Sequence, residues 1–596
     1  MKDKISWTTC IKQFLRYASP YGYKLILAIL ALIFSNGIYA MNPSIEGSIT
    51  TQLMKDVEEI SKGVEGAHIH FDIVLKIIGI LIICYLTRAA MILVSNFLLT
   101  NAIQSMMHDL RNALQRKIQR LPVRYFDNRA FGDVLSTVTN DVDTLSNGLQ
   151  QTFTKAITGF LTFLLAFVMM FRINWKMGAL ALIILPLTAL ITKIFVGRSQ
   201  KLFQLQQTNV GELNGKITEL YGGFNEIILY NKQEDVKEQF KEVNERMAQS
   251  AFKAQFVSSL ISPFVSLVTY LTIGAASVVG CIFVMQGSIT VGSLQAFIRY
   301  IWQINEPLSQ VSQLSAQVQA SFAAMGRIFT LLEEEEEAQE GTASIVPEEM
   351  KGNVSFAHVQ FGYGEDLLMK DVNFHVKSGQ MVAIVGPTGA GKTTLMNLLL
   401  RFYDVKGGSI KIDGVDIRDM DRGKLHSLFS LVLQDTWLFH GSIYENIRYG
   451  NLNARKDEVI DAAKMANVHH FIRTLSHGYD SIINEDANNI SQGEKQLLTI
   501  ARAILKDPQI LILDEATSSV DTRLERMLQD AMQKVMKGRT SFVIAHRLST
   551  IKNADLILVM QDGNIIEQGT HESLLEQKGF YEQLYHSQFA NGEIES

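Results

Sequence analysis

Cysteine is scarce in this sequence, and neither sign of charge dominates it. Three of the 596 residues are cysteines. Two of them lie in strongly apolar stretches, so we expect packing roles rather than a disulfide framework for Cys10, Cys84 and Cys281. The formal net charge is −5, and the sequence contains neither a block of basic residues nor a visible internal repeat. The small number of cysteines argues against a protein stabilised by disulfides, and the lack of a basic block argues against a nucleic acid partner.

Apolar residues, by contrast, are abundant. They make up 47% of the chain, and the mean hydropathy of +0.11 exceeds what a soluble protein usually has. The apolar runs crowd before residue 312, and a helix needs roughly 20 apolar residues to cross a bilayer. We therefore expect six membrane spans, at about 23–41, 73–99, 157–171, 179–195, 256–285 and 291–311.

Lysine and arginine are distributed unevenly between the connections of these spans. Most of them lie in the lead segment up to Lys24, around 111–129 and within 193–253, whereas the alternating connections hold few. Short connections rich in these residues stay in the cytoplasm. We expect a multi-pass protein of the cell membrane whose amino and carboxyl termini are both cytoplasmic.

An acidic run ends the membrane part of the sequence. The five glutamates at 333–337, followed by Gly341 and Pro347, are typical of a solvated linker. We expect a transmembrane domain at 1–332, an acidic linker at 333–349 and a second domain at 350–596.

The two long cytoplasmic connections are mixed in charge and helical in pattern. Glycine and asparagine interrupt this pattern at 124–133 and 220–225, where aromatic residues also occur. These tips are candidates for contact with another domain, and plain solvent-exposed turns are the alternative.

The second domain contains a phosphate-binding motif. Residues 386–393 read G-x-x-x-x-G-K-T, after a strand-like segment at 381–385 and before a helix-like one at 394–400. Glycines in this context turn backbone N–H groups toward phosphates at a helix N-terminus. Lys392 would neutralise phosphate charge, and the Thr393 hydroxyl would hold Mg²⁺. The expected nucleotide-binding residues are Gly386, Pro387, Thr388, Gly389, Ala390, Gly391, Lys392, Thr393 and Thr394.

A second motif follows at the end of a buried strand. The apolar run at 510–513 leads into Asp514 and Glu515, which suits a parallel strand that delivers carboxylates to the edge of a sheet. Asp514 would support the Mg²⁺ shell, and Glu515 would orient or deprotonate the attacking water.

Together these motifs resemble the ATP-binding cassette (ABC) family, specifically exporter half-transporters that fuse six membrane helices to one nucleotide-binding domain. The resemblance covers essentially the whole chain and implies an ATP hydrolase coupled to transport, with ATP and Mg²⁺ as cofactors. It also implies adenine stacking by Tyr363, a Q-loop contact with Mg²⁺ or water by Gln434, a D-loop acid at Asp521 and a γ-phosphate contact by His546.

The signature loop of this family reads Leu-Ser-Gly-Gly-Gln, and this chain departs from it at 490–494. Ser491 and Gly493 are kept, whereas Gln492 adds a side chain where glycine lets the backbone approach, and Glu494 adds negative charge near an anion. In the family the signature of one subunit faces the ATP held by the other. We therefore expect a non-identical partner half-transporter with an intact signature and a degenerate Walker B motif. A homodimer with a tolerated variant signature is the alternative.

One acid upstream of the signature also has a family counterpart. Glu485 matches a residue that exporters use for cross-talk with the membrane loops, although Asn484 and Asp486 replace the neighbouring family residues.

The expected fold is thus a six-helix transmembrane domain of the ABC exporter type fused to an α/β P-loop nucleotide-binding domain. The expected function is export of hydrophobic or amphipathic compounds, such as drugs and dyes, by alternating access. A lipid or lipid-precursor flippase, a homodimeric exporter and a channel on the same scaffold remain alternatives. The spans argue against a soluble ABC protein, and the fusion of both domains argues against an importer.

Polar side chains within spans are costly in lipid, so each is a candidate substrate contact. Each also has an ordinary explanation as a helix–helix contact or as a residue beyond the membrane edge. These candidates are Asn36, Arg88, Asn96, Arg299, Trp302, Asn305 and Glu306.

Overall fold

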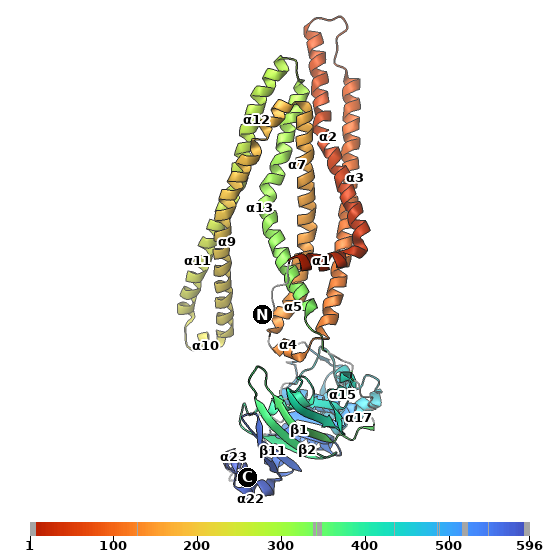
Figure 1. Cartoon of the computed structure of the whole chain (residues 1–596), viewed down its shortest axis with the longest axis vertical. Helices are drawn as coiled ribbons and strands as arrows, with labels where there is room; N and C mark the ends of the chain where they lie inside the picture. The colour runs from red at the N-terminus through yellow and green to blue at the C-terminus, as the bar shows by residue number, and fades with distance from the viewer. Residues whose placement is uncertain are drawn as a thin grey trace. The chain divides into compact units, whose positions relative to one another are not determined.

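A computed structural model describes residues 7–127, 129–337, 341, 349–433, 436–484, 487, 489–514, 522–545 and 548–588. The chain divides into two compact units (Figure 1). The first comprises Met1–Leu121 and Arg129–Glu335, and the second comprises Pro122–Asn128 and Glu336–Ser596. The short segment at 122–128 therefore belongs with the carboxyl-terminal unit, although it comes from one of the long cytoplasmic connections.

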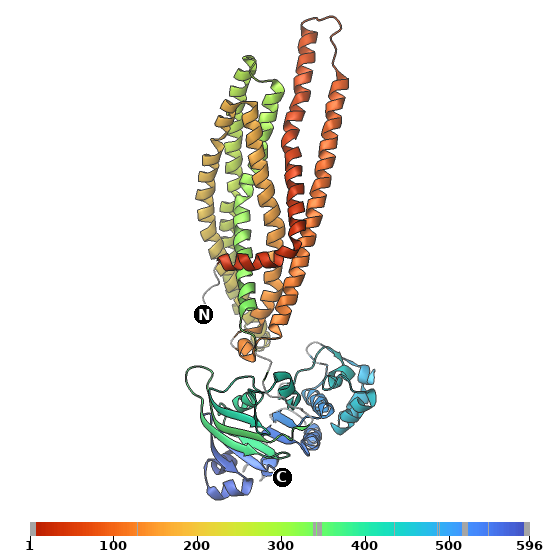
Figure 2. The same cartoon turned by 45° about the vertical axis from the view of Figure 1, so that its right-hand side comes forward.

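The first unit is a bundle of long helices (Figures 1 and 2). At a rise of about 1.5 Å per residue, the 40 residues of α2 extend for about 60 Å, twice the roughly 30 Å thickness of a hydrocarbon core. The principal helices are α1 (Trp7–Ala18), α2 (Gly22–Ser61), α3 (Phe71–Ile118), α7 (Thr154–Ile173), α8 (Trp175–Ala181), α9 (Ile184–Gly222), α11 (Gln233–Ser259), α12 (Ile261–Met285) and α13 (Val291–Glu333).

Shorter helical segments connect these long helices. Two of them, η2 and η3, are single π-helical turns that lead from α5 through α6 into α7. The connecting segments are η1 (Ser19–Tyr21), α5 (Phe131–Ser136), η2 (Thr137–Asp141), α6 (Val142–Gly148), η3 (Leu149–Phe153) and α10 (Phe224–Leu229).

Five helical stretches in the described part of the chain are long and apolar enough to cross a membrane. They are Thr8–Ser61, Phe71–Ile118, Phe131–Ile173, Trp175–Gly222 and Gln233–Met285. The sixth expected span, at about 291–311, lies in α13, which is less apolar because it carries glutamine, asparagine and Arg299. This helix packs against α2, α7 and α12, so part of its surface meets protein rather than lipid and tolerates polar residues.

Two glycines allow α2 and α13 to pack at backbone distance. A Cβ atom on Gly292 would lie 1.7 Å from the carbonyl oxygen of Gly47, and one on Gly47 would lie 2.2 Å from the carbonyl oxygen of Gly292. Small residues at membrane helix interfaces permit such close contact. The buried side chains of Phe297, Tyr300 and Ile301 continue the contact surface of α13.

The second unit contains a six-stranded sheet in the order β12-β11-β3-β10-β9-β6 and a four-stranded sheet in the order β2-β1-β4-β5. In the larger sheet β6, β9, β10, β3 and β11 are parallel, and β12 is antiparallel at the edge. The strands are β1 (Val354–Phe361), β2 (Met369–Val376), β3 (Met381–Val385), β4 (Gly407–Ile412), β5 (Val415–Asp416), β6 (Phe429–Val432), β7 (Gly441–Ser442), β8 (Ile482–Ile483), β9 (Ile510–Asp514), β10 (Thr540–Ile544), β11 (Leu556–Gln561) and β12 (Asn564–Gly569).

Helices pack on these sheets around several hydrophobic cores, two of which are large. One core joins the four-stranded sheet to α14, and the other joins α17, α19 and α20 to one face of the larger sheet. The helical segments are α4 (Val123–Asp127), α14 (Lys392–Leu399), α15 (Arg422–Ser427), α16 (Ile443–Arg448), α17 (Lys456–Met465), α18 (His469–Thr474), η5 (Gly478–Asp480), α19 (Gln492–Lys506), α20 (Thr522–Met536), α21 (Leu548–Lys552), α22 (His571–Gln577) and α23 (Phe580–Gln588). The predicted fold class, a helical membrane domain followed by an α/β domain, is confirmed.

Candidate functional site

The phosphate-binding motif forms the turn between a buried strand and a helix, as its sequence context predicts. β3 ends at Val385, the loop occupies 386–391, and α14 begins at Lys392. Gly391, which precedes the helix, has φ 98°, a left-handed conformation that favours glycine. A Cβ atom on Gly386 would lie 2.3 Å from the carbonyl oxygen of Met560. The loop therefore requires glycine at both ends, and its N–H groups precede a helix N-terminus suited to an anion.

Asp514 reaches the same edge of the sheet from a neighbouring strand. In the parallel register, Ile384 pairs with Ile544 of β10, and Ile544 pairs with Asp514 of β9. The three strands thus end side by side, with the phosphate loop after one and a carboxylate on another.

Lys392 connects these two features. Its ammonium group donates hydrogen bonds to the carbonyl oxygens of Gly386, at 2.7 Å, and of Pro387, at 3.0 Å. Burial lowers the pKa of Lys392, and the charge of Asp514 opposes that change. An anion bound in the loop would add favourable charge to a cation that is already partly desolvated.

Tyr363 stands beside the first turn of α14. Its hydroxyl lies 3.0 Å from the Thr394 hydroxyl, and the residue is 57% exposed. Its ring makes edge-to-face contacts with Phe361 and Tyr403, both at 5.0 Å between centroids. The structure thus brings Tyr363, the phosphate loop and Asp514 together, and the exposed ring offers a flat surface to a base.

Tyr403 extends this aromatic group to α4. Its hydroxyl donates a hydrogen bond to the Asp127 carboxylate, the last residue of α4. Burial and this hydrogen bond raise the pKa of the Tyr403 phenol. The sequence predicted a contact role for the loop at 124–133 but not for Tyr403, whose only local signal was an aromatic pair after α14.

The signature residues lie at the start of α19, beside the other hydrophobic core. Ser491 is the N-cap, and its hydroxyl accepts from the backbone N–H of Glu494 at 3.4 Å. The Glu494 carboxylate accepts from the backbone N–H of Ser491, at 2.8 Å, and from its hydroxyl, at 2.7 Å. This reciprocal arrangement is a capping box. Gln492 is exposed and Gly493 is buried. The Ser491 hydroxyl and the Glu494 carboxylate are therefore both engaged in capping their own helix.

Several residues named by the sequence analysis lie outside the described part of the chain. They are Gln434, Glu485, Glu515, Asp521 and His546. Strands that precede three of them are described, since β6 ends at Val432, β9 at Asp514 and β10 at Ile544.

The structure separates the polar candidates of the membrane spans into helix contacts and other residues. Asn36 donates to the carbonyl of Leu32 at 2.8 Å and accepts from Thr162 of α7 at 3.1 Å. Asn305 accepts from Thr269 of α12 at 3.2 Å. These two side chains therefore connect helices. Asn96 is exposed on α3, and the side chain of Glu306 lies outside the described positions.

The remaining candidates form two cation contacts and one aromatic contact. The guanidinium of Arg88 lies 3.8 Å from the ring centroid of Tyr39. Arg299 is 3.6 Å from Glu46, which also accepts a hydrogen bond from Tyr85 at 2.9 Å.

Trp302 and Arg299 belong to a face of α13 that lines a hollow of about 410 Å³. Trp302 meets Tyr270 edge to face at 5.3 Å. The lining residues recur at three- and four-residue spacing, so they share one side of the helix; they are Val291, Leu294, Gln295, Ile298, Arg299 and Trp302. Apolar, amide, indole and guanidinium groups therefore meet in one place within the expected spans.

Comparison with known proteins matches both units. Residues 25–308 match the family described as the ABC transporter transmembrane region, and residues 369–518 match the family described as ABC transporter. A fatty acid ABC transporter ATP-binding/permease protein of Mycobacterium tuberculosis is 44% identical over 522 residues, which are 87% of this chain and 82% of that protein. ATP-dependent lipid A-core flippases are also similar. The one from Syntrophus aciditrophicus is 34% identical over 86% of each chain, and the one from Yersinia pestis is 32% identical over 99% of each.

Proposed function

This chain belongs to the ABC transporter family, and from that membership we propose that it exports a lipid-like amphiphile with an anionic head. It is a multi-pass membrane protein of the half-transporter exporter type, in which ATP hydrolysis drives transport. The names of its relatives refer to a fatty acid and to the lipid A-core. They favour the lipid alternative over the drug and dye range expected from the sequence.

The observation that carries this proposal is the pair of arginines within the expected spans. Cations are costly in hydrocarbon and are usually retained there for function. Arg299 lines the hollow on α13, and among the described ion pairs its carboxylate partner is Glu46 at 3.6 Å. A carboxylate or phosphate head would pair with such a guanidinium by charge-assisted hydrogen bonds, while the apolar residues beside it would hold a hydrocarbon tail.

The nucleotide-binding unit supplies the energy. We infer that Tyr363 stacks on adenine and that Lys392 and the loop N–H groups bind the phosphates. Glu515 would orient the attacking water, His546 would contact the γ-phosphate, and Asp521 would act across the dimer interface.

The oxygen donors around the phosphate loop fit Mg²⁺, which prefers hydroxyl, amide and carboxylate oxygens. Thr393, Gln434 and Asp514 would hold it, and Asp514 already stands at the sheet edge next to the loop. The ion would neutralise phosphate charge during hydrolysis.

We further propose that the amino and carboxyl termini are cytoplasmic and that transport proceeds by alternating access. ATP binding would draw two nucleotide-binding units together, and hydrolysis would release them. The loops at 124–133 and 220–225 would transmit the motion.

We also propose an unequal pair of subunits. The negative charge of Glu494 lies at the helix start that would face the ATP held by the partner. The site formed by this signature and the partner's phosphate loop should therefore bind ATP more weakly. The phosphate loop of this chain keeps its lysine and Asp514, and an intact signature on a different partner subunit would complete it.

The cargo proposal is tested by ATPase stimulation of the detergent-purified complex. A long-chain fatty acid or an anionic phospholipid should raise turnover several-fold, whereas a lipophilic cationic dye should not. R299A should weaken the lipid response by about tenfold in half-saturating concentration, which is the loss of about 1.4 kcal/mol. Stimulation by the dye alone would contradict the proposal.

The unequal pair is tested by purifying this chain without any partner. We expect little ATPase activity that depends on amphiphile, with activity restored by a co-purified second half-transporter. A homodimer with full stimulated turnover would refute the pairing and leave the cargo proposal standing.

A further inference from the structure

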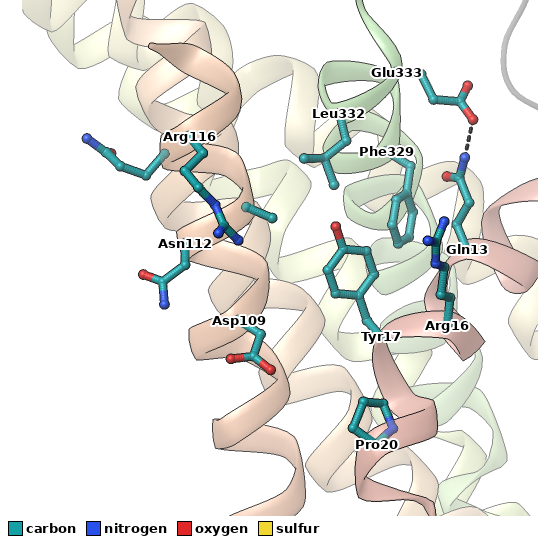
Figure 3. A pocket seen from close by; sticks show the side chains of 12 residues that line it. Gln13, Arg16, Tyr17, Pro20, Asp109, Asn112, Arg116, Phe329, Leu332 and Glu333 are labelled. Carbon is teal, nitrogen blue, oxygen red and sulfur yellow. Dashed lines mark hydrogen bonds between the residues drawn. The ribbon is translucent and has the colours of Figure 1, made fainter. Parts of the chain in front are cut away.

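A second, larger pocket lies in the first unit, between α1, the carboxyl-terminal part of α3 and the end of α13 (Figure 3). Its volume of about 960 Å³ is at the upper end of the range for small-molecule sites. The hollow on α13 occupies the other end of that helix, at 291–302. The two cavities share no lining residue.

The helix α1 that forms one wall of this pocket is amphipathic. Ile11 and Leu15, one turn apart, are 41% and 58% exposed, while Cys10 is buried against the bundle. The helix crosses the long helices rather than running along them (Figures 1 and 2). Such a helix is suited to lie in the plane of a membrane interface with its apolar face toward acyl chains. Its position before the first span assigns it to the cytoplasmic side, given the orientation proposed above.

Two guanidinium groups, those of Arg16 and Arg116, line the pocket together with the carboxylates of Asp109 and Glu333. Among the ion pairs of the described residues, none involves Arg16 of α1 or Arg116 of α3. Of the two acids in the pocket, Asp109 accepts the Tyr21 hydroxyl at 2.6 Å, contacts His108 at 3.4 Å and interacts electrostatically with Arg116, whereas Glu333 accepts from the Gln13 amide. Neither guanidinium forms a direct ion pair with these two acids, so both keep N–H donors that can bind an external anion.

The rest of the lining provides an acceptor and an apolar wall. The amide oxygen of Gln13 is buried and has no hydrogen-bond partner, so it can accept from a hydroxyl or ammonium donor. The rings of Tyr17 and Phe329 pack with centroids 6.1 Å apart. Figure 3 shows Tyr17 and Arg16 rising from α1, Arg116 reaching from α3, and Phe329 and Leu332 standing on α13.

We propose that this pocket binds the head group of an anionic phospholipid from the cytoplasmic leaflet. The phosphate pairs with Arg16 and Arg116, a head-group hydroxyl donates to Gln13, and the acyl chains run along the exposed apolar residues of α1. Anionic lipids are enriched in cytoplasmic leaflets and are bound there by basic groups at helix ends. The site goes beyond the proposed function, because it is a resident lipid site whether or not the cargo is a lipid.

The test is native mass spectrometry of the full detergent-purified chain, without ATP, titrated with phosphatidylglycerol, phosphatidylcholine or inorganic phosphate. Wild type should bind one phosphatidylglycerol at least fivefold more tightly than phosphatidylcholine. R16Q/R116Q should lose that preference. The matched control K12A/R120A removes one positive charge from α1 and one from Arg120, two residues past the end of α3, at positions that do not line the pocket, and it should keep the preference.

Three outcomes would overturn the proposal. One is R16Q/R116Q binding phosphatidylglycerol as wild type does, another is an equal loss in K12A/R120A, and the third is competition by millimolar inorganic phosphate, which would make the site one for a free anion. Should R16Q/R116Q unfold, R16K/R116K keeps both charges and should retain the preference; its loss in a folded protein would also overturn the site. R299A should bind phosphatidylglycerol normally, so failure of the cargo proposal remains distinguishable.

Discussion

At the scale of single residues, Glu494 has two roles. It completes the capping box of α19, and it adds negative charge to the signature. Glutamine at this position also forms a capping box, so E494Q should remove the charge and keep the helix start. Removing a like charge at an exposed site is worth about 1 kcal/mol, or about fivefold in affinity. We therefore expect E494Q to tighten binding of a non-hydrolysable ATP analogue by about fivefold in the complex, measured by equilibrium binding.

A matched control for this change is available in the same unit. Ser442 and Glu445 form a second capping box, at the start of α16, outside the signature. E445Q should leave nucleotide affinity unchanged. Equal effects of the two substitutions, or none from E494Q, would mean that the charge at 494 does not weaken the site.

His426 makes the nucleotide-binding unit sensitive to acid. Burial lowers the pKa of His426. The hydrogen bond to the Leu400 carbonyl opposes this change, and the neighbouring cations Arg422, Lys506 and Arg401 add to it, so the net shift is downward. Its Nε2 lies 3.0 Å from the carbonyl oxygen of Leu400, which a neutral ring satisfies as a donor. The unfolded chain therefore binds a proton more readily than the native one, and stability falls as the pH drops through about 6.5.

The corresponding measurement compares thermal unfolding at pH 7.5 and pH 5.5. Wild type should lose melting temperature at the lower pH. H426Q should lose about 2–4 °C less, the shift that about 1 kcal/mol produces in a domain of this size. An identical pH dependence in both proteins would contradict the role given to His426.

Residue identity alone reveals part of this chemistry. The sequence predicted the glycine positions and Lys392 because the phosphate loop is a local pattern of adjacent residues. The capping box of Ser491 and Glu494 had a local signal too, Ser-x-x-Glu before an apolar helix, although only the charge of Glu494 entered the expectation from the sequence. Arg16 and Arg116 gave no signal, because their pocket joins helices that are far apart in sequence.

At the scale of elements, α4 is the short helix that packs with the nucleotide-binding unit while its flanking helices belong to the membrane unit. The contact between Asp127 and Tyr403 spans 276 positions, so no sequence pattern could predict it. Tyr403 also touches Tyr363. A shift of the Tyr363 ring can therefore change the position of α4 through Tyr403.

We expect Y403F to uncouple transport from hydrolysis. The ring and its edge-to-face contacts remain, while the hydrogen bond to Asp127 is lost. The lost hydrogen bond, with a charged acceptor, is worth about 1.5–3 kcal/mol. It lies outside the phosphate loop, so basal ATPase activity should stay within about twofold of wild type. Stimulation by amphiphile should fall sharply. Y479F removes a tyrosine hydroxyl that contacts His469 at 2.7 Å in the other core and should retain stimulation; full stimulation in Y403F would refute the coupling.

The close contact of α2 and α13 leads to a second prediction for elements. In G292A the new methyl group would collide with the Gly47 carbonyl oxygen, so the helices must separate. The loss of close packing should lower the melting temperature by several degrees, as overpacking costs about 1–3 kcal/mol. G274A adds the same methyl group on α12 where no atom lies within 4 Å. Equal melting temperatures for the two variants would contradict the close α2–α13 contact.

The whole molecule combines a membrane unit with cations among its apolar helices and an ATPase unit whose loop and carboxylate share one sheet edge. The two-part fold was predictable because apolar runs and the phosphate loop are strong, local signals. The sixth span, at about 291–311, stays a prediction, because polar residues such as Arg299 lower the hydropathy of α13. The cargo could not be read from sequence patterns, because drug pumps and lipid exporters share the ATPase motifs.

The most direct test of ATP-driven export of an anionic amphiphile is transport by the reconstituted complex. In proteoliposomes with ATP outside, a fluorescent anionic phospholipid or fatty acid should move from the outer to the inner leaflet, measured by its protection from an impermeant quencher. E515Q should bind ATP and abolish this movement. Equal movement in wild type and E515Q, or movement without ATP, would contradict the account.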